Sequence, residues 1–333
     1  MITFLDLPGH EKYLTTTMSG MFGSQPDYSI VMVAGNKGIG PMAREHILLC
    51  LMLHVPFLVV LSKIDLSPTQ NKETLVSLRK LLKAPGVTKT PMVVHDDSDL
   101  PVCIQHTKTG SVVPIVKVSF KTGEGVKLLI KLLNCLPPRT NYGKLSKKPV
   151  EMSVKESFHV KGTGTVIHGL LTQGTLCVGE KVLVGPTGTG SFMSTRIRSL
   201  HCKRVLVQEI TAGKHACINV VLDRSKIKRG MMVISADNPP KSIWEFKAHL
   251  YILKNRHHTT IRLGYEPVIH VGDVKQTAKI IDIQSSHGEV LRAGQKAHVV
   301  MRFKTRPVFL NKGARFAFRE EKTRGMGTVV ELL

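Results

Sequence analysis

Acidic residues are scarce in this sequence for its size. Its 333 residues include 24 Asp and Glu against 47 Lys and Arg, a formal net charge of +23. The excess is uneven, because residues 1–138 hold 14 basic and 10 acidic residues, whereas residues 139–333 hold 33 and 14. Such an excess indicates a polyanionic partner, either nucleic acid or an anionic membrane. A basic surface that is merely solvated is the alternative.

Paired cysteines and long apolar runs are also lacking. The six cysteines include no C-x-x-C pair, which argues against a zinc ribbon or a disulfide framework and favours reduced thiols in the cytoplasm. The longest apolar run, 47–61, contains His54 and Pro56 and is too short to span a bilayer. Residues 1–13 carry acids and a proline, unlike a signal peptide. We therefore expect a cytoplasmic protein without a membrane span. We also expect no binding to an anionic membrane surface, because the sequence lacks the amphipathic basic helix that this would need.

Aromatic residues make up only 5% of the chain. This scarcity disfavours base stacking on single strands and favours contacts to the backbone of folded RNA. Two basic runs, Lys226–Arg229 and Arg302–Arg306, lie in the basic part of the chain. Either they are lysine-rich edge strands that resist aggregation, or together they form a phosphate-binding surface.

The first part of the chain alternates between apolar runs and helical periodicity. We predict strands at 2–5, 28–34, 57–61 and 115–118, and helices at 42–53, 75–83 and 126–136. Strands that are apolar on both faces belong to parallel sheets covered by helices. This alternation predicts a doubly wound α/β domain.

The character of the sequence changes after Pro137-Pro138. Residues 139–149 are basic and turn-rich, and beyond them short strands recur between glycines, as in a β-barrel. A second break at 238–241 precedes another alternating β pattern that starts at Trp244. The predicted boundaries are an α/β domain at 1–138, a linker at 139–149 and β-barrels at 150–238 and 243–333.

A candidate phosphate-sensing loop, D-L-P-G-H, follows the first predicted strand. Ligands of open α/β sheets bind beyond the carboxyl ends of the strands. There, Asp6 could hold Mg²⁺ through water, and the backbone of Gly9 could approach a terminal phosphate. His10 would stand beside an attacking water molecule. Taken alone, D-x-P-G is also a common strand-to-turn sequence.

Two further motifs follow predicted strands in the order of a guanine site. Ser62-Lys63-Ile64-Asp65 resembles the N-K-x-D motif, in which the Asp accepts two hydrogen bonds from guanine and the Lys stem covers the ring. Ser119-Phe120-Lys121, followed by T-G-E-G, resembles the S-A-x loop, whose backbone N–H meets the guanine carbonyl.

These motifs, together with the stretch 44–49 (R-E-H-I-L-L), the segment 158–166 and the ending 315–329, resemble the elongation factor Tu and elongation factor 1-alpha family. Within it the chain resembles the GTP-binding protein 1 and 2 group, including W-E-F at 244–246. The resemblance implies a monomeric GTPase that binds GTP or GDP with Mg²⁺ and acts with the ribosome and tRNA or other structured RNA. It implies that Lys63 and Asp65 hold the base, supported by Ser62, Ser119, Phe120 and Lys121.

The sequence departs from the family in two places. Ser62 stands where Asn is usual and is too short to make the same contacts, which would soften guanine selectivity by about one hydrogen bond. The GTP-binding protein 1 and 2 group tolerates Thr at this place, so we interpret Ser62 as a variant and not as a defect. No G-x-x-x-x-G-K-[ST] phosphate loop is present, and the glycine-rich 185–190 is predicted to be a hairpin turn. We therefore expect a partial G domain that lacks its first strand and phosphate loop, in a chain incomplete at its N-terminus. The alternative is an RNA- or ribosome-binding protein that no longer depends on a nucleotide.

Overall fold

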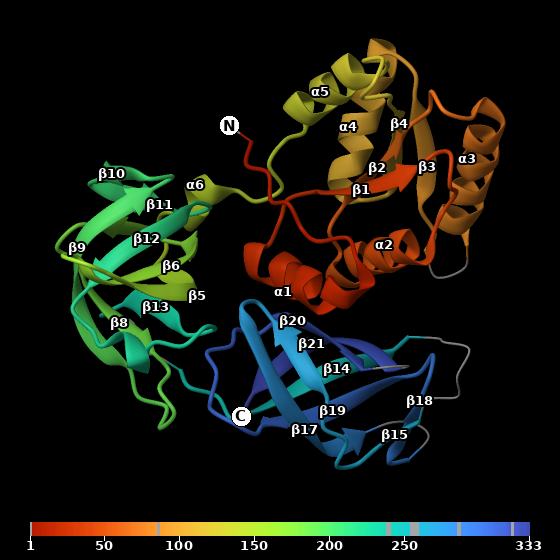
Figure 1. Cartoon of the computed structure of the whole chain (residues 1–333). Coiled ribbons are helices and arrows are strands. Elements are labelled where there is room, and N and C mark those ends of the chain that lie inside the picture. Colours follow the sequence, from red (N-terminus) through yellow and green to blue (C-terminus); the bar gives the residue numbers. More distant parts are fainter. Residues whose placement is uncertain (1, 85–86, 238–240, 254–259, 285–287, 321–322) are drawn as a thin grey trace. The chain divides into compact units, whose positions relative to one another are not determined.

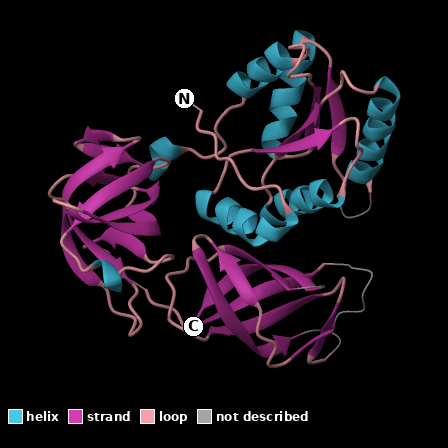
Figure 2. Ribbon diagram, in the orientation of Figure 1, coloured by secondary structure: helices cyan, strands magenta, loops and turns pink. Residues whose placement is uncertain are grey.

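The computed structural model describes residues 2–84, 87–237, 241–253, 260–284, 288–320 and 323–333 (Figure 1). The chain forms two compact units. The first comprises Met1–Thr17 and Pro26–Thr140, and the second comprises Met18–Gln25 and Asn141–Leu333. Helices gather around a sheet in the first unit, whereas strands make up most of the second (Figure 2). None of the helices among the described residues combines the length and apolarity needed to cross a bilayer.

A parallel four-stranded sheet forms the centre of the first unit. Its order is β1 (Ser29–Ala34), β2 (Phe57–Ser62), β4 (Val112–Lys117) and β3 (Thr90–Val94). Every residue of β2 is buried, as a strand covered on both faces must be. The strands predicted at 28–34, 57–61 and 115–118 are thus confirmed, with ends shifted by a few residues, while β3 was not predicted. At the edge of the sheet, β1 is less buried than expected, and Met32 is 51% exposed.

The strand predicted at 2–5 is wrong. Residues 2–9 have no regular secondary structure, and Ile2, Phe4 and Leu5 are 47%, 68% and 52% exposed. An apolar run becomes a strand only when its N–H and C=O groups find partners. Among the described residues, β1 pairs with β2 alone, so no strand pairs with 2–5.

Among the described residues, four helices lie wholly in the first unit, and α1 (Leu14–Ser24) begins there and continues into the second. The four are α2 (Pro41–Leu53), α3 (Pro68–Lys83), α4 (Leu100–Thr109) and α5 (Val126–Cys135), and the unit also has 3₁₀ turns η1 (Glu11–Tyr13) and η2 (Asp97–Asp99). Proline occupies the first turn of α2 and α3, where its missing N–H costs nothing. The predicted helices 42–53 and 126–136 are confirmed, whereas α3 begins seven residues before the predicted 75–83, and α1 and α4 were not predicted.

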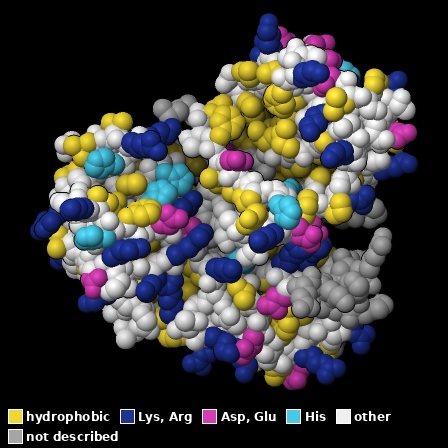
Figure 3. Space-filling view, viewed as in Figure 1, with side chains coloured by type: hydrophobic (Ala, Val, Ile, Leu, Met, Phe, Trp, Pro, Cys, Tyr) yellow, Lys and Arg dark blue, Asp and Glu magenta, His cyan; other side chains and the backbone are white. Residues whose placement is uncertain are grey.

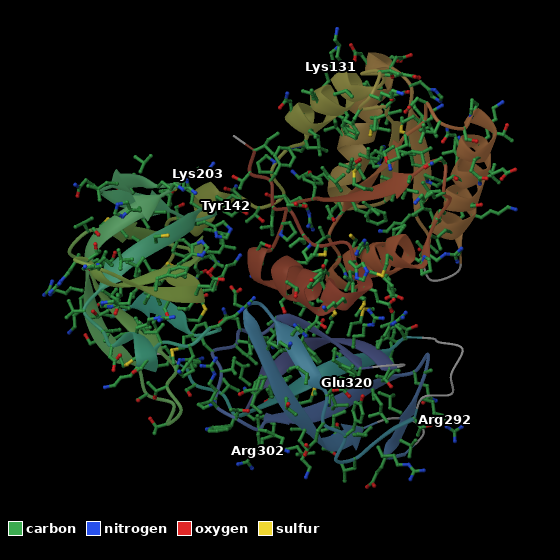
Figure 4. All side chains as sticks on the ribbon, viewed as in Figure 1. Lys131, Tyr142, Lys203, Arg292, Arg302 and Glu320 are labelled. Carbon is green, nitrogen blue, oxygen red and sulfur yellow. The ribbon has the colours of Figure 1, made fainter. Side chains whose placement is uncertain are left out.

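The two faces of the sheet are covered by different helices. Leu58, Val60 and Val116 pack with Leu100, Cys103, Leu129 and Leu132 of α4 and α5 in one apolar cluster. Lys131 on α5 forms an ion pair with Asp97 in η2 (Figure 4). Helix α3 lies on the opposite side of the sheet (Figure 1). Because helices cover both faces of the sheet, its strands fix the positions of the residues at their carboxyl ends.

The second unit contains two β domains, preceded by a short helix, α6 (Tyr142–Leu145), within the predicted linker. The first has a seven-stranded sheet of order β10-β9-β12-β6-β5-β13-β8, and β8 also pairs with β9. Its strands are β5 (Glu151–Val160), β6 (Gly164–Gln173), β8 (Lys181–Gly185), β9 (Met193–Cys202), β10 (Val205–Val207), β12 (His215–Val220) and β13 (Met232–Ser235), with a small sheet of β7 (Thr175–Cys177) and β11 (Glu209–Thr211) and a 3₁₀ turn η3 (Arg224–Lys226). The predicted hairpin at 185–190 is confirmed, because β8 and β9 pair antiparallel on either side of it.

The second β domain is a closed barrel. Its ring is β14 (Glu245–Ile252), β19 (Lys296–Phe303), β17 (Val274–Gln284), β16 (Val268–Val271), β20 (Arg315–Glu320) and β21 (Thr323–Leu332), and β15 (Thr260–Arg262) pairs with β18 (Val290–Arg292) beside it. Burial alternates along β14, as the sequence pattern predicts. The predicted break at 238–241 falls mostly outside the described residues.

Charged side chains join the two β domains. Asp273, in the turn between β16 and β17, is 5% exposed and lies 3.7 Å from the guanidinium of Arg229 in the first barrel. Burial raises the pKa of Asp273, although Lys155 and Arg229 oppose the shift. The guanidinium of Arg306 donates to the carbonyl oxygen of Arg229. The two basic runs of the sequence therefore adjoin at this seam.

The end of α1 packs on the second barrel. Ser19 Oγ lies 3.1 Å from Nδ1 of His270, and a Cβ added at Gly23 would overlap the Asp273 carboxylate. His270 is 4% exposed. Its pKa is lowered to about 4, first by burial and then by the positive charges of Lys275 and Arg229.

Candidate functional site

Two of the predicted loops meet at the carboxyl edge of the parallel sheet, where ligands of such sheets bind. Ser62 ends β2 and leads into Lys63 and Asp65, while Ser119 follows β4. Ser119 Oγ donates a hydrogen bond of 2.7 Å to Asp65 Oδ1. Ser119 is fully buried, whereas Asp65 is exposed. The structure therefore brings these two residues together and leaves the carboxylate accessible to a ligand.

The loop after β4 is a compact turn built around Ser119. Its backbone N–H donates to the Glu124 carbonyl at 2.9 Å, and its Oγ accepts from the Thr122 N–H at 3.2 Å. In the part of the chain that the structure describes, the backbone N–H groups of Phe120 and Lys121 donate to no other group. Phe120 is 63% exposed. Two donors beside Asp65 are thus available to an external acceptor.

The Asp65 carboxylate is prepared to remain charged. Its pKa is lowered chiefly by the hydrogen bond from Ser119, then by its own backbone, with smaller contributions from Lys121 and Lys63. An ionised carboxylate only accepts hydrogen bonds. This edge can therefore pair with a ligand that presents adjacent N–H donors.

The Ser62–Asp65 segment has an unusual backbone. Lys63 is exposed and adopts a left-handed conformation with φ of +60°. Ser62 is buried, and its Oγ donates to the Val33 carbonyl of β1 at 3.3 Å. Asn71, on the first turn of α3, donates from Nδ2 to the Ile64 carbonyl at 2.6 Å. Sequence reasoning missed Asn71, because it lies in a polar stretch outside any motif, ahead of the predicted start of its helix.

Among the described residues, no hydrogen bond joins the D-L-P-G-H loop to the loops of Asp65 and Ser119. Asp6, Gly9 and His10 are exposed. Nδ1 of His10 accepts from the Lys12 N–H at 3.2 Å, so this histidine caps η1. A Cβ added at Gly9 would lie 3.8 Å from His46 Cε1, an ordinary contact distance.

His46, on α2, lies beside the D-L-P-G-H loop and was not singled out from the sequence. Burial lowers its pKa, and its Nε2 has no hydrogen-bond partner among the described residues. It belongs to the R-E-H-I-L-L stretch, which signalled only the resemblance. No group of three or more His, Cys, Asp or Glu side chains suited to a metal ion occurs among the described residues.

The basic runs of the second unit are partly neutralised. Arg302 on β19 pairs with Glu245 at 3.3 Å (Figure 4), and Lys304 pairs with Glu266 at 2.6 Å. Lys226 and Lys228 are exposed, and further Lys and Arg side chains are scattered over the face of the β domains seen in Figure 3. The basic surface thus extends well beyond the two runs.

Comparison with known proteins covers most of the chain. Residues 1–138 match the Elongation factor Tu GTP binding domain, residues 164–234 match Elongation factor Tu domain 2, and residues 239–333 match the Elongation factor Tu C-terminal domain. Three domain models of one family thus match in the order of that family.

Individual relatives agree with this match. GTP-binding protein 1 of Xenopus laevis is 38% identical over 335 residues, which include 100% of this chain and 50% of that protein. GTP-binding protein 2 of Homo sapiens is 38% identical over 338 residues, with 100% and 56% covered. The chain therefore spans about half the length of these relatives. Elongation factor 1-alpha of Archaeoglobus fulgidus is 28% identical over 356 residues, covering 99% of this chain and 79% of that protein.

Solved structures show the same fold. The translation elongation factor SelB from Methanococcus maripaludis, in complex with the GTP analogue GppNHp, superimposes with a TM-score of 0.73 at 21% identity. The match covers 98% of this chain and 70% of that one. The chain belongs to the translational GTPases of the elongation factor Tu type, with a G domain followed by two β-barrel domains.

Proposed function

We propose that the chain is the GTP-binding part of a translation-factor-like protein that hydrolyses GTP to GDP and phosphate and acts with the ribosome and tRNA or other structured RNA. Its parts would be a G domain at 1–138, a linker at 139–149 and barrels at 150–238 and 243–333. The observation that supports this best is the 2.7 Å hydrogen bond between Ser119 and Asp65, because it joins the two loops of a guanine site.

Guanine fits the donors and acceptors at this edge. Asp65 would accept hydrogen bonds from the two N–H groups of the guanine edge, and a backbone N–H of Phe120 or Lys121 would meet the guanine carbonyl. The exposed stem of Lys63 would cover one face of the ring. Ser62 and Ser119, both buried, would support the loops from below.

The phosphates and Mg²⁺ would lie toward the D-L-P-G-H loop. Mg²⁺ keeps most of its water and takes one or two carboxylates together with phosphate oxygens, so a single exposed carboxylate, Asp6, fits a site completed by the nucleotide. Bound Mg²⁺ would neutralise charge on the phosphates. Gly9 would offer its backbone N–H to the terminal phosphate, and His10 would orient the attacking water.

Nucleotide binding tests the proposal directly. In the protein purified at its natural length, GDP binding should weaken by about 10²- to 10⁴-fold in Asp65→Ala, because two charge-assisted hydrogen bonds are lost. Asp97→Ala is the matched control, since Asp97 is an exposed carboxylate outside the site. Equal affinity of the unaltered protein for GDP and ADP would contradict the proposal. His10→Ala should slow GTP hydrolysis and leave GDP affinity unchanged.

The RNA partner is supported by charge. Residues 139–333 carry 33 basic and 14 acidic residues. Affinity for a folded RNA such as tRNA should fall steeply between 50 and 200 mM salt, as released counterions require. An affinity that does not depend on salt would refute this part of the proposal. We further propose a cytoplasmic monomer, in keeping with six free cysteines.

The same charge asymmetry favours a second candidate, an RNA- or ribosome-binding protein without nucleotide control. RNA binding that persists while GTP at millimolar concentration fails to bind the unaltered protein would support this candidate. Binding of GTP would exclude it.

A further inference from the structure

The loop proposed to bind guanine, Ser62–Asp65, contains a strained backbone conformation that its surroundings must stabilise. Lys63 has φ of +60°, a conformation that costs about 1–2 kcal/mol in a residue with a Cβ. Such a conformation persists only where the surroundings fix it. The neighbouring backbone bonds are long, 3.5 Å from the Ile64 N–H to the Val118 carbonyl and 3.2 Å from the Leu66 N–H to the Lys63 carbonyl.

Ser62 does not hold this loop with its side chain. Its Oγ donates backward to the Val33 carbonyl in the neighbouring strand, at 3.3 Å. Its carbonyl accepts from the Gly35 N–H at 2.8 Å, which also ties it to the end of β1. Ser62, which occupies the Asn position of N-K-x-D, therefore stabilises the edge of the sheet. Another residue must stabilise the loop.

Asn71 holds the loop from α3. Its Nδ2 donates to the Ile64 carbonyl at 2.6 Å, one residue before Asp65, and its own N–H is fixed by the helix at 3.0 Å from the Ser67 carbonyl. Asn71 is 9% exposed. Because a carbonyl oxygen only accepts hydrogen bonds, the contact with Ile64 also fixes which end of the amide is the donor.

The other end of the Asn71 amide is confined as well. Its Oδ1 is buried without a hydrogen-bond partner among the described residues, and a Cβ added at Gly35 would overlap it. An unpaired buried oxygen is costly, so an amide kept in this position needs a compensating role. Thr74, one turn further along α3, donates to the Gly35 carbonyl at 2.8 Å and holds the β1 turn instead.

We propose that Asn71 is the positioning residue of the guanine-reading loop, supplying from α3 the bracing that Ser62 cannot supply within the motif. The inference rests on the proposed function. Through Ile64, Asn71 sets the direction of the Asp65 carboxylate and thereby the discrimination of guanine from bases that lack one of its two N–H donors.

The test compares GDP with inosine diphosphate, which lacks the 2-amino group that Asp65 would bind. In the protein at its natural length, Asn71→Ala should lower the ratio of GDP affinity to inosine diphosphate affinity about fivefold, the value of one hydrogen bond. Asn71→Asp keeps the size of the side chain and removes the donor, so it should lower the ratio similarly. Thr74→Val is the matched control, because it removes a buried hydrogen bond of the same helix outside this loop and should leave the ratio unchanged.

The possible results distinguish a failure of the role proposed for Asn71 from a failure of the proposed function. An unchanged ratio in folded Asn71→Asp overturns the inference, and so does unfolding of both Asn71 variants where Thr74→Val folds, because Asn71 would then be a structural residue. A fall in the ratio that Thr74→Val shares overturns it too. If the unaltered protein does not distinguish the two nucleotides, or Asp65→Ala binds GDP as the unaltered protein does, the proposed function fails and the inference with it.

Discussion

The turn that carries Ser119 offers a paired test of local packing. Gly123 and Gly125 both adopt left-handed conformations, with φ of +84° and +73°. A Cβ added at Gly123 would meet nothing within 4 Å, whereas one added at Gly125 would overlap the carbonyl oxygen of Lys117. Alanine at either position therefore suffers the same backbone penalty, and only at Gly125 does it also collide with β4.

The two substitutions should differ measurably in stability. A left-handed alanine costs about 1–2 kcal/mol, which is the expected loss for Gly123→Ala. Overpacking against a backbone that is held in a sheet adds about 1–3 kcal/mol, so Gly125→Ala should lose about 2–5 kcal/mol. That is a large share of the roughly 5–15 kcal/mol that stabilises a typical domain.

Urea unfolding followed by far-ultraviolet circular dichroism near 222 nm measures the difference, because the long helices belong mainly to the first unit. The unfolding midpoint should fall in the order unaltered protein, Gly123→Ala, Gly125→Ala, with the slope unchanged. GDP affinity should fall only in Gly125→Ala, since the displaced turn carries Ser119. Equal destabilisation by the two substitutions would refute the collision on which the reasoning depends.

Three further predictions concern other parts of the chain. Asp65→Asn should weaken the binding of GDP and strengthen the binding of xanthosine diphosphate, whose base presents a carbonyl where guanine has an amine. Competition titration measures both affinities, and an unchanged preference would show that Asp65 does not contact the base. His270, whose pKa is lowered, contributes stability that is fully present above pH 6.5 and is lost as the pH falls toward 4, by at most about 3 kcal/mol. The urea midpoint should therefore fall less on acidification in His270→Gln than in the unaltered protein, and parallel losses would contradict this. Gly23→Ala should destabilise the packing of α1 on the second barrel by about 1–3 kcal/mol, because its Cβ meets the buried Asp273 carboxylate; an unchanged hydrogen-exchange rate in α1 would count against it.

Elements set by local pattern were predictable from the sequence. Strand β2 and helix α2 lie where the sequence pattern predicts them. A fully buried strand is recognisable as a continuous apolar run, and the start of α2 is recognisable from its proline. The strand expected at 2–5 failed for the opposite reason. Its residues suit a strand, but pairing depends on a neighbour that composition does not reveal.

The residues of the candidate site show the same difference between what local pattern predicts and what depends on tertiary structure. Asp65 and Ser119 could be selected because each follows a strand of one parallel sheet, and topology then brings them within hydrogen-bond distance. Asn71 could not be selected, since its role depends on how the first turn of α3 returns over the loop. That turn, with its polar residues, carries no apolar periodicity from which its position could be inferred.

The open side of β1 has a consequence for handling the protein. The described residues give β1 one partner, β2, and leave Met32 half exposed on an apolar strand. An unpaired edge of this kind is a template for strand addition by another chain, whereas a closed ring such as β14-β19-β17-β16-β20-β21 removes its edges. In a protein of residues 1–333, aggregation on warming should therefore begin in the first unit, and Met32→Lys should delay the onset of turbidity.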